Sequence, residues 1–186
     1  MSIRRRAILS FFLALIIVPA GSAQSTVTAE KPTSAGRLLT FTARPTKPLF
    51  DLGEEIVFRF RLRNVSSKRI FVSRYMTVGD FITLTVIDPD GKKVPWQGKI
   101  RSVGYSKDAF QFLETNNEVS ADHTISLAKG EGFEIKQAGR YTVIADYSLG
   151  PPEYFANLAP KGSIPEGPFK APTTHFTITA SRDAKP

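Results

Sequence analysis

The chain has 186 residues, a formal net charge of +8 and no cysteine. Its length suits one domain with its own hydrophobic core, and the lack of cysteine excludes a disulfide scaffold, thiolate metal sites, a cysteine nucleophile and a lipidated cysteine. Cleavage of a predicted signal peptide would remove three arginines and lower the net charge from +8 to +5. This charge is too mildly basic to indicate nucleic-acid binding.

The first 23 residues have the three parts of a secretory signal peptide. Arginines at positions 4–6 form a basic start, the apolar run AILSFFLALIIVPA follows, and the small residues Gly21 and Ala23 lie where cleavage is expected. The apolar run is shorter than the roughly 20 residues that a membrane-spanning helix needs, and an uncleaved anchor is the alternative. We predict a signal peptide over residues 1–23, cleaved after Ala23.

The sequence after this site predicts a soluble protein in the periplasm or outside the cell. Residues 24–37 are rich in Ser, Thr, Ala and Pro without periodicity, which predicts a flexible leader. No later segment is apolar and long enough to span a bilayer. The mature chain is therefore expected not to cross a membrane.

The first predicted strand is RLLTFTA, residues 37–43, and the prolines and glycine of RPTKPLFDLG then predict a turn. The next stretch, EEIVFRFRLRN over residues 54–64, alternates apolar and basic side chains. Successive side chains of a strand point to opposite faces, whereas a helix would scatter the arginines around its axis. The pattern predicts a strand of an antiparallel sheet with one buried and one wet face. The residues expected on the buried face are Ile56, Phe58, Phe60 and Leu62, and those on the wet face are Val57, Arg59, Arg61 and Arg63.

Short segments of the same kind recur to the end of the chain, separated by turn residues. DPDGKK, residues 88–93, predicts a hairpin turn, and Pro95 predicts an edge strand in KVPWQG. These features predict an all-β fold, an antiparallel immunoglobulin-like β-sandwich of about eight strands over residues 38–180, followed by a disordered tail over residues 181–186. The further predicted strands are residues 69–75, 80–88, 93–98, 108–113, 122–128, 139–147 and 173–180.

Three stretches of the sequence resemble parts of known bacterial β-domains. They are LGEEIVFRFRLRNVSSKRIFV, GDFITLTVIDPDGKKVPWQG and AGRYTVIADY. They look like the immunoglobulin-like sandwich of bacterial intracellular proteinase-inhibitor domains. They also resemble the non-catalytic N-terminal β-domain of deuterolysin-type zinc peptidases, whose catalytic part needs an HExxH-type helix that this chain lacks. The resemblance implies a peptidase-associated module without the enzyme. The positions that carry it are Gly53, Glu54, Asn64, Asp90, Gly91, Gly139 and Tyr141.

The arginine row of the second strand has two interpretations. Arg59, Arg61 and Arg63 recur about 7 Å apart on one sheet face, and Lys68, Arg69 and Arg74 are expected on the neighbouring strand. Such a row can hold an anionic glycan, a lipid headgroup or an acidic partner. The alternative is a solvated face whose charge keeps the protein soluble and is neutralised by nearby acids.

The Pro- and Gly-rich segment of residues 150–172 is a long connection that predicts a functional or covering loop. Its aromatic residues Tyr154, Phe155 and Phe169 are candidate apolar anchors for a partner protein. The alternative is that these rings close the open ends of the sandwich.

Catalytic and metal-binding signals are absent from the sequence. His123 and His175 lack the spacing of a zinc site or a catalytic triad and are expected to be solvated imidazoles. Asp88 and Asp90 resemble the start of a calcium loop, but a hairpin turn explains them. Asn64-Val65-Ser66 fits a glycosylation sequon, although a strand-end turn is simpler. We expect no enzyme, no metal and no cofactor.

The function that we predict is that of an exported, non-enzymatic binding module. Its partner is expected to be a peptidase or another envelope protein, contacted through the 150–172 loop, with charge steering by the arginine row. The alternative is binding to a carbohydrate or to the cell-envelope surface through the arginine row and Trp96. A strong loss of binding with added salt would favour this alternative.

Overall fold

A computed structural model describes residues 38–98, 106–128, 130–160 and 162–180. The predicted signal peptide, leader and tail lie outside these residues. The described strands form a three-stranded sheet, a six-stranded sheet and two strand pairs. The strands of the three-stranded sheet are, in spatial order, β1 (Leu39–Pro45), β3 (Val57–Asn64) and β9 (Glu118–Thr124).

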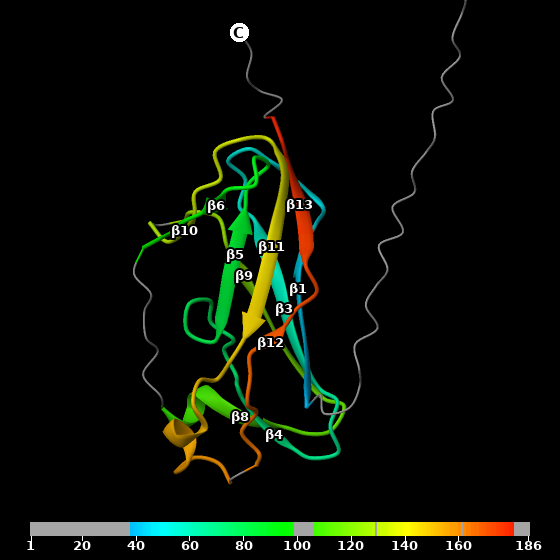
Figure 1. Ribbon diagram of the computed structural model, residues 1–186, viewed down its shortest axis with the longest axis vertical. Coiled ribbons are helices and arrows are strands. Elements are labelled where there is room, and N and C mark those ends of the chain that lie inside the picture. The colour runs from blue at the N-terminus through cyan, green and yellow to red at the C-terminus, as the bar shows by residue number, and fades with distance from the viewer. Residues whose placement is uncertain (1–37, 99–105, 129, 161, 181–186) are drawn as a thin grey trace, which may run out of the picture. The chain divides into compact units, whose positions relative to one another are not determined.

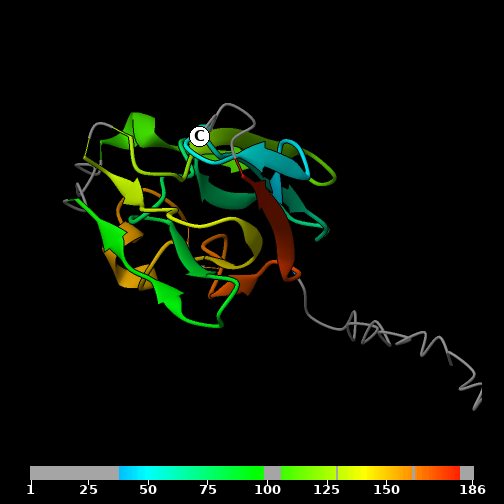
Figure 2. The same cartoon turned by 90° about the horizontal axis from the view of Figure 1, so that it is seen from above.

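The six-stranded sheet faces the three-stranded sheet, and together they form a β-sandwich (Figures 1 and 2). Its order is β2-β13-β11-β5-β6, and β12 pairs with β11. All pairings in both sheets are antiparallel except that of β2 with β13. The predicted antiparallel all-β sandwich is thus confirmed. The bounds are β2 (Leu49–Asp51), β13 (Thr174–Thr179), β11 (Gly139–Tyr147), β5 (Ile82–Ile87), β6 (Lys93–Val94) and β12 (Phe169–Lys170).

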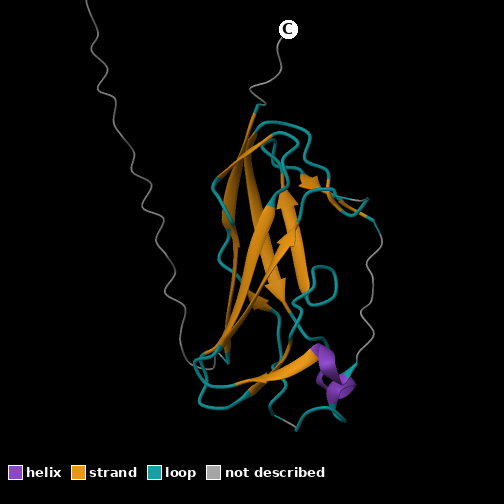
Figure 3. Ribbon diagram, turned by 180° about the vertical axis from the view of Figure 1, so that it is seen from behind, coloured by secondary structure: helices purple, strands orange, loops and turns teal. Residues whose placement is uncertain are grey.

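The remaining strands are short and lie outside the two large sheets. Two 3-10 helices, η1 (Lys107–Ala109) and η2 (Pro152–Phe155), lie at the same end of the sandwich as β4 and β8 (Figure 3). The remaining strands form the pairs β4 (Ile70–Ser73) with β8 (Phe110–Leu113) and β7 (Trp96–Gln97) with β10 (Gly132–Phe133).

The strand order is that of an immunoglobulin-like domain. Strands β1, β3 and β9 take the places of A, B and E in one sheet, and β5, β11 and β13 take those of C, F and G in the other. Tyr141 supplies a tyrosine corner, since its hydroxyl donates a hydrogen bond of 2.9 Å to the carbonyl oxygen of Gln137, four residues upstream. Val143 is buried two residues later, where antibody domains have a cysteine.

Aromatic packing between the sheets takes the place of a disulfide. Phe58 of β3 meets Phe176 of β13 edge to face, with ring centroids 5.9 Å apart, and Phe41 of β1 lies 5.9 Å from Tyr147 of β11. The hydroxyl oxygen of Tyr147 accepts the buried Ser73 N–H at 3.0 Å, and burial raises the pKa of this tyrosine far above its usual value. Because large apolar rings are buried from both sheets, their burial stabilises the sandwich without a disulfide.

Several predicted elements need correction. The stretch predicted as a turn before the second strand contains β2, which forms the parallel edge pair with β13. The predicted strand over residues 122–128 begins earlier, at Glu118, because its register is set by pairing with β3. Pro95 interrupts the predicted strand 93–98, since it has no N–H to donate, and splits it into β6 and β7.

The predicted hairpin turn at residues 88–93 and Gly139 contact each other in the structure. Oδ1 of Asp88 accepts the N–H groups of Asp90 and Lys92 at 3.0 and 2.8 Å and thereby closes the β5–β6 hairpin, as the hairpin-turn interpretation predicts. Gly139 packs on this hairpin, and a Cβ at its position would lie 2.5 Å from Cγ of Pro89. Only glycine allows this contact between the start of β11 and the turn.

Candidate binding face

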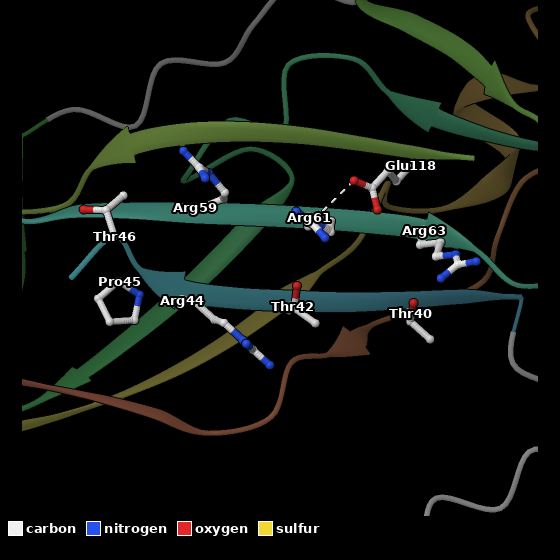
Figure 4. A pocket seen from close by; sticks show the side chains of 9 residues that line it. All are labelled: Thr40, Thr42, Arg44, Pro45, Thr46, Arg59, Arg61, Arg63 and Glu118. Atoms are coloured by element: carbon white, nitrogen blue, oxygen red, sulfur yellow. Dashed lines mark ion pairs between the residues drawn. The ribbon is translucent and has the colours of Figure 1, made fainter. Parts of the chain in front are cut away.

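The outer face of the three-stranded sheet carries the arginine row, as the alternation predicts. We call the arginine face the set of residues on the solvent side of β1 and β3 that line one shallow hollow of about 500 Å³. The side chains project from two neighbouring strands on one side of the sheet (Figure 4). The arginine face consists of Thr40, Thr42, Arg44, Arg59, Arg61 and Arg63.

The register between the strands sets the order of the side chains across this face. Arg44 of β1 lies directly opposite Arg59 of β3, while Thr42 faces Arg61 and Thr40 faces Arg63. Arg44 is therefore the fourth member of the row, although the sequence pattern of the second strand did not include it. The signal for it was the alternation of LTFTAR, which places Arg44 on the same face as the threonines.

Acidic side chains of β9 neutralise half of the row. Arg59 forms a two-bond ion pair with Asp122, in which Nε donates to Oδ1 at 2.8 Å and Nη2 donates to Oδ2 at 2.7 Å. These hydrogen bonds lower the pKa of Asp122 and raise that of Arg59. Arg61 lies 3.4 Å from Glu118, measured from Nε to Oε1.

The other two arginines, Arg44 and Arg63, are unpaired within the part of the chain that the structure describes. Within the described residues, neither Arg44 nor Arg63 has an ion-pair partner within 4.0 Å. Arg44 lies on β1, beside threonine hydroxyls. Arg63 lies between Thr40 of β1 and Glu118 of β9, whose carboxylate is within ion-pair distance of Arg61. The arginine face thus has an acidic border at β9, and its basic character is strongest at Arg44.

The basic residues predicted beside the row lie elsewhere. Lys68, Arg69 and Arg74 flank β4, which pairs with β8 and not with β3. Arg69 stacks over the ring of Phe112, with its guanidinium carbon 4.4 Å from the ring centroid. Sequence proximity suggested that β3 and β4 are neighbours, but the chain leaves the sheet after Asn64.

The 150–172 segment contributes both core and surface aromatics. Phe155 is fully buried, with its ring centroid 5.1 Å from that of Phe110, so it closes the end of the sandwich instead of facing a partner. Phe169 is half-buried in β12. Tyr154 is 69% exposed, and an apolar hollow of about 340 Å³ lies against the same helix, η2, lined by Pro152 and Ile164 among others. Of these three aromatic residues, only Tyr154 has a largely exposed side chain.

Trp96 does not belong to the arginine face. It lies in β7, where its ring meets that of Phe133 edge to face at 5.1 Å, and it packs against the core. Its Nε1 atom is buried without a hydrogen-bond partner in the described residues. The sequence placed Trp96 and the arginines in one glycan site, whereas the fold assigns them to different strand pairs.

The two histidines have different environments, and only one matches the expectation of a surface imidazole. His175 lies on the outer side of β13, with Nδ1 3.1 Å from the Thr142 hydroxyl. His123 points inward from β9, with its ring centroid 5.9 Å from that of Phe60 and its Nε2 atom buried. The described residues contain no group of three or more His, Asp or Glu side chains arranged to hold a metal ion.

Comparison with known proteins gives no family. No protein-family model matches the chain, and no curated protein matches it. Among solved structures, a β-glucosidase from Erythrobacter marinus matches with 13% identity and a TM-score of 0.38 over 76% of this chain and 15% of its own. A β-glucosidase from Listeria innocua in complex with isofagomine matches with 10% identity and a TM-score of 0.36 over 89% of this chain and 21% of its own. The chain spans less than a quarter of either enzyme.

The described part of the chain has no helix with the length and apolar character needed to cross a bilayer.

Proposed function

We propose that the protein is an exported, non-enzymatic binding module that holds an anionic polysaccharide on its arginine face. The observation that carries this proposal is the presence of four arginines on one open sheet face, of which two form ion pairs within the described residues. Guanidinium groups bind carboxylate and sulfate groups through two parallel hydrogen bonds, and threonine hydroxyls add further donors. Arg44 and Arg63 are free to make such bonds.

The placement of Arg44 supports a ligand over mere solubility. It lies directly opposite Arg59 in the sheet, and like charges in opposed positions on a sheet destabilise it. The carboxylate that lies opposite Arg59 on the other side of β3, that of Asp122, is engaged with Arg59 through both oxygens. An anion placed over β1 would relieve this repulsion.

A polysaccharide suits the face better than a lipid bilayer. Binding at a membrane surface usually combines basic residues with apolar side chains that enter the acyl boundary. None of the exposed large apolar residues in the described ranges lines this hollow. Arginine and threonine make up most of the lining, with Pro45 and Glu118 beside them, which favours a polar, hydrated polymer.

The test uses dextran sulfate as the probe and neutral dextran as its control. We expect calorimetry to detect binding of dextran sulfate that weakens steeply between 25 and 250 mM salt, since added ions screen exposed charges. The double variant Arg44→Gln/Arg63→Gln should weaken it at least about tenfold, a loss that two charge-assisted hydrogen bonds account for.

The matched control is Arg140→Gln together with Lys170→Gln, which removes two charges from the exposed side of the other sheet. The proposal fails if this control weakens binding as much as the arginine-face variant does. It also fails if neutral dextran binds equally well. Circular dichroism of each variant verifies the fold.

A second candidate is a peptidase-associated module, for which the exposed Tyr154 is the favouring observation. The resemblance to proteinase-inhibitor domains suggests the partner, and the apolar hollow beside η2 would receive one of its side chains. Inhibition of subtilisin or thermolysin by the protein, lost in Tyr154→Ala and retained in Arg44→Gln/Arg63→Gln, would favour this candidate over the first.

A further inference from the structure

Strand β9 has one paired and one open edge. It pairs with β3 over seven residues and, within the described residues, with no other strand. The sheet of a constant-type immunoglobulin domain continues at this point, because strand D lies beside strand E. No described residue fills the place that corresponds to strand D next to β9.

The hydrogen-bond phase of the β3–β9 pair shows which backbone groups are open. The Asn64 N–H donates to the carbonyl of Asn117, and the Ile125 N–H donates to that of Ile56. Since these bonds alternate along an antiparallel pair, residues 119, 121 and 123 bond to β3. The backbone groups of residues 118, 120, 122 and 124 point away from it. None of these four has a backbone hydrogen bond in the described part of the chain.

The side chains of β9 give its two faces different polarity. Val119, Ala121 and His123 point toward the interior but remain only half-buried. Glu118 and Asp122 point to the opposite face, toward solvent, where their carboxylates border the arginine face. A strand added here would cover the half-buried row and would place its other side chains next to the two acids.

We infer that the open edge of β9 is a docking site for an extended segment of a partner protein, which adds to the sheet as a strand. The segment is expected to carry lysine or arginine opposite Glu118 and Asp122 and small apolar residues opposite Val119, Ala121 and His123. Backbone hydrogen bonds supply the affinity in this mode of recognition, and alternate side chains supply the specificity. Glu118 and Asp122 already face Arg61 and Arg59 of β3, so a lysine on the added strand would share each carboxylate with an arginine and opposite charges would alternate across the three strands.

Charge also argues against a second copy of this chain as the occupant. If two β9 strands paired antiparallel about Ser120, Glu118 of each copy would face Asp122 of the other. If they paired about Ala121, the two Asp122 side chains would become diagonal neighbours. Such like-charge contacts are a common protection of sheet edges against self-pairing.

The probe is the capped heptapeptide TVKVTVK, whose lysines fall opposite Asp122 and Glu118 when it adds antiparallel to β9. NMR titration of the isotope-labelled protein should shift the amides of residues 118–124 and slow the exchange of the amides at 118, 120, 122 and 124. Ser120→Pro should weaken binding at least about tenfold, because it removes an edge donor. Ser120→Ala is the matched control and should bind as the wild type does.

Two further peptides keep the test independent of how the proline variant folds. A peptide methylated on the backbone nitrogens of its first lysine and second threonine cannot complete the ladder and should bind at least about tenfold more weakly. The peptide TVEVTVE should also lose affinity. Equal binding of all three peptides, shifts confined to other strands, or dimerisation of the free protein through β9 in sedimentation experiments would overturn the inference. Unchanged dextran sulfate binding by Ser120→Pro would separate this edge from the arginine face.

Discussion

Replacement of Phe60 by alanine is expected to lower the free energy of unfolding by about 3–5 kcal/mol. The Phe60 side chain is fully buried in the middle of β3, where its ring contacts those of Phe41 and Phe58 at centroid distances of 6.2 Å. Its loss removes apolar surface from the core and leaves a cavity that rigid strands on either side cannot fill. Urea denaturation followed by circular dichroism measures the change.

The neighbouring residue provides the control for this prediction. Arg61 points to the opposite face of the same strand and is half-exposed, with a single ion pair to Glu118. Arg61→Ala should leave the urea midpoint nearly unchanged, since exposed ion pairs contribute little to stability. Equal effects of the two substitutions would contradict the sidedness of β3 on which the fold and the arginine face both depend.

Replacement of Asn64 by alanine is expected to cost about 2–4 kcal/mol, although the residue is polar and stands at the end of a strand. Asn64 is fully buried, and its Nδ2 donates to the carbonyl oxygens of Lys68 and Leu113 at 2.7 and 2.8 Å. Its Oδ1 accepts the N–H of Ser66 at 2.9 Å. The alanine variant would leave these groups without a partner, which thermal or urea denaturation will detect. Asn117→Ala, at an exposed position next to the same strand end, is the matched control.

Asn64→Asp should add a pH dependence of known sign. A carboxylate would face two carbonyl oxygens, so the pKa of the aspartate in the folded state would lie above its unfolded value. The folded state then holds the proton more tightly, and stability falls as pH rises through the folded pKa. We expect this variant to be less stable, relative to the wild type, at pH 7 than at pH 4. An equal difference at both values would show that the amide nitrogen is not held by the two carbonyls.

The role of Asn64 also bears on the glycosylation sequon that the sequence contains. In the folded protein both donor hydrogens of Nδ2 point to carbonyl oxygens within the structure. The strand-end turn predicted as the simpler alternative is therefore what the residue forms.

The parts of the fold that could be predicted are those encoded by period-two alternation. In β3 the alternate residues Phe58, Phe60 and Leu62 are all fully buried, and the arginines between them are exposed. The same holds for β11, whose predicted bounds agree with the structure. One buried face determines the register of such strands, so local sequence is sufficient to identify them.

The neighbours of each strand could not be predicted, because pairing depends on segments far apart in the chain. Arg44 lies on the arginine face because of the register between β1 and β3. Strand β4 pairs with β8 and not with β3, although the two strands are close in sequence. His123 was expected to be a solvated imidazole because no zinc-site or triad spacing surrounds it in the sequence. Pairing with β3 turned this imidazole inward.

The position of β13 has a consequence for the order of folding. This last strand lies between β2 and β11, and its Phe176 stacks on Tyr141 at 5.1 Å. A nascent chain that stops before residue 174 would leave two strands with bare edges and a central ring without its neighbour. Closure of the larger sheet must therefore wait for nearly the whole polypeptide, since its decisive contacts join the two ends of the domain. Under the export that we propose, such late closure would keep the larger sheet open until nearly the whole chain has been translocated.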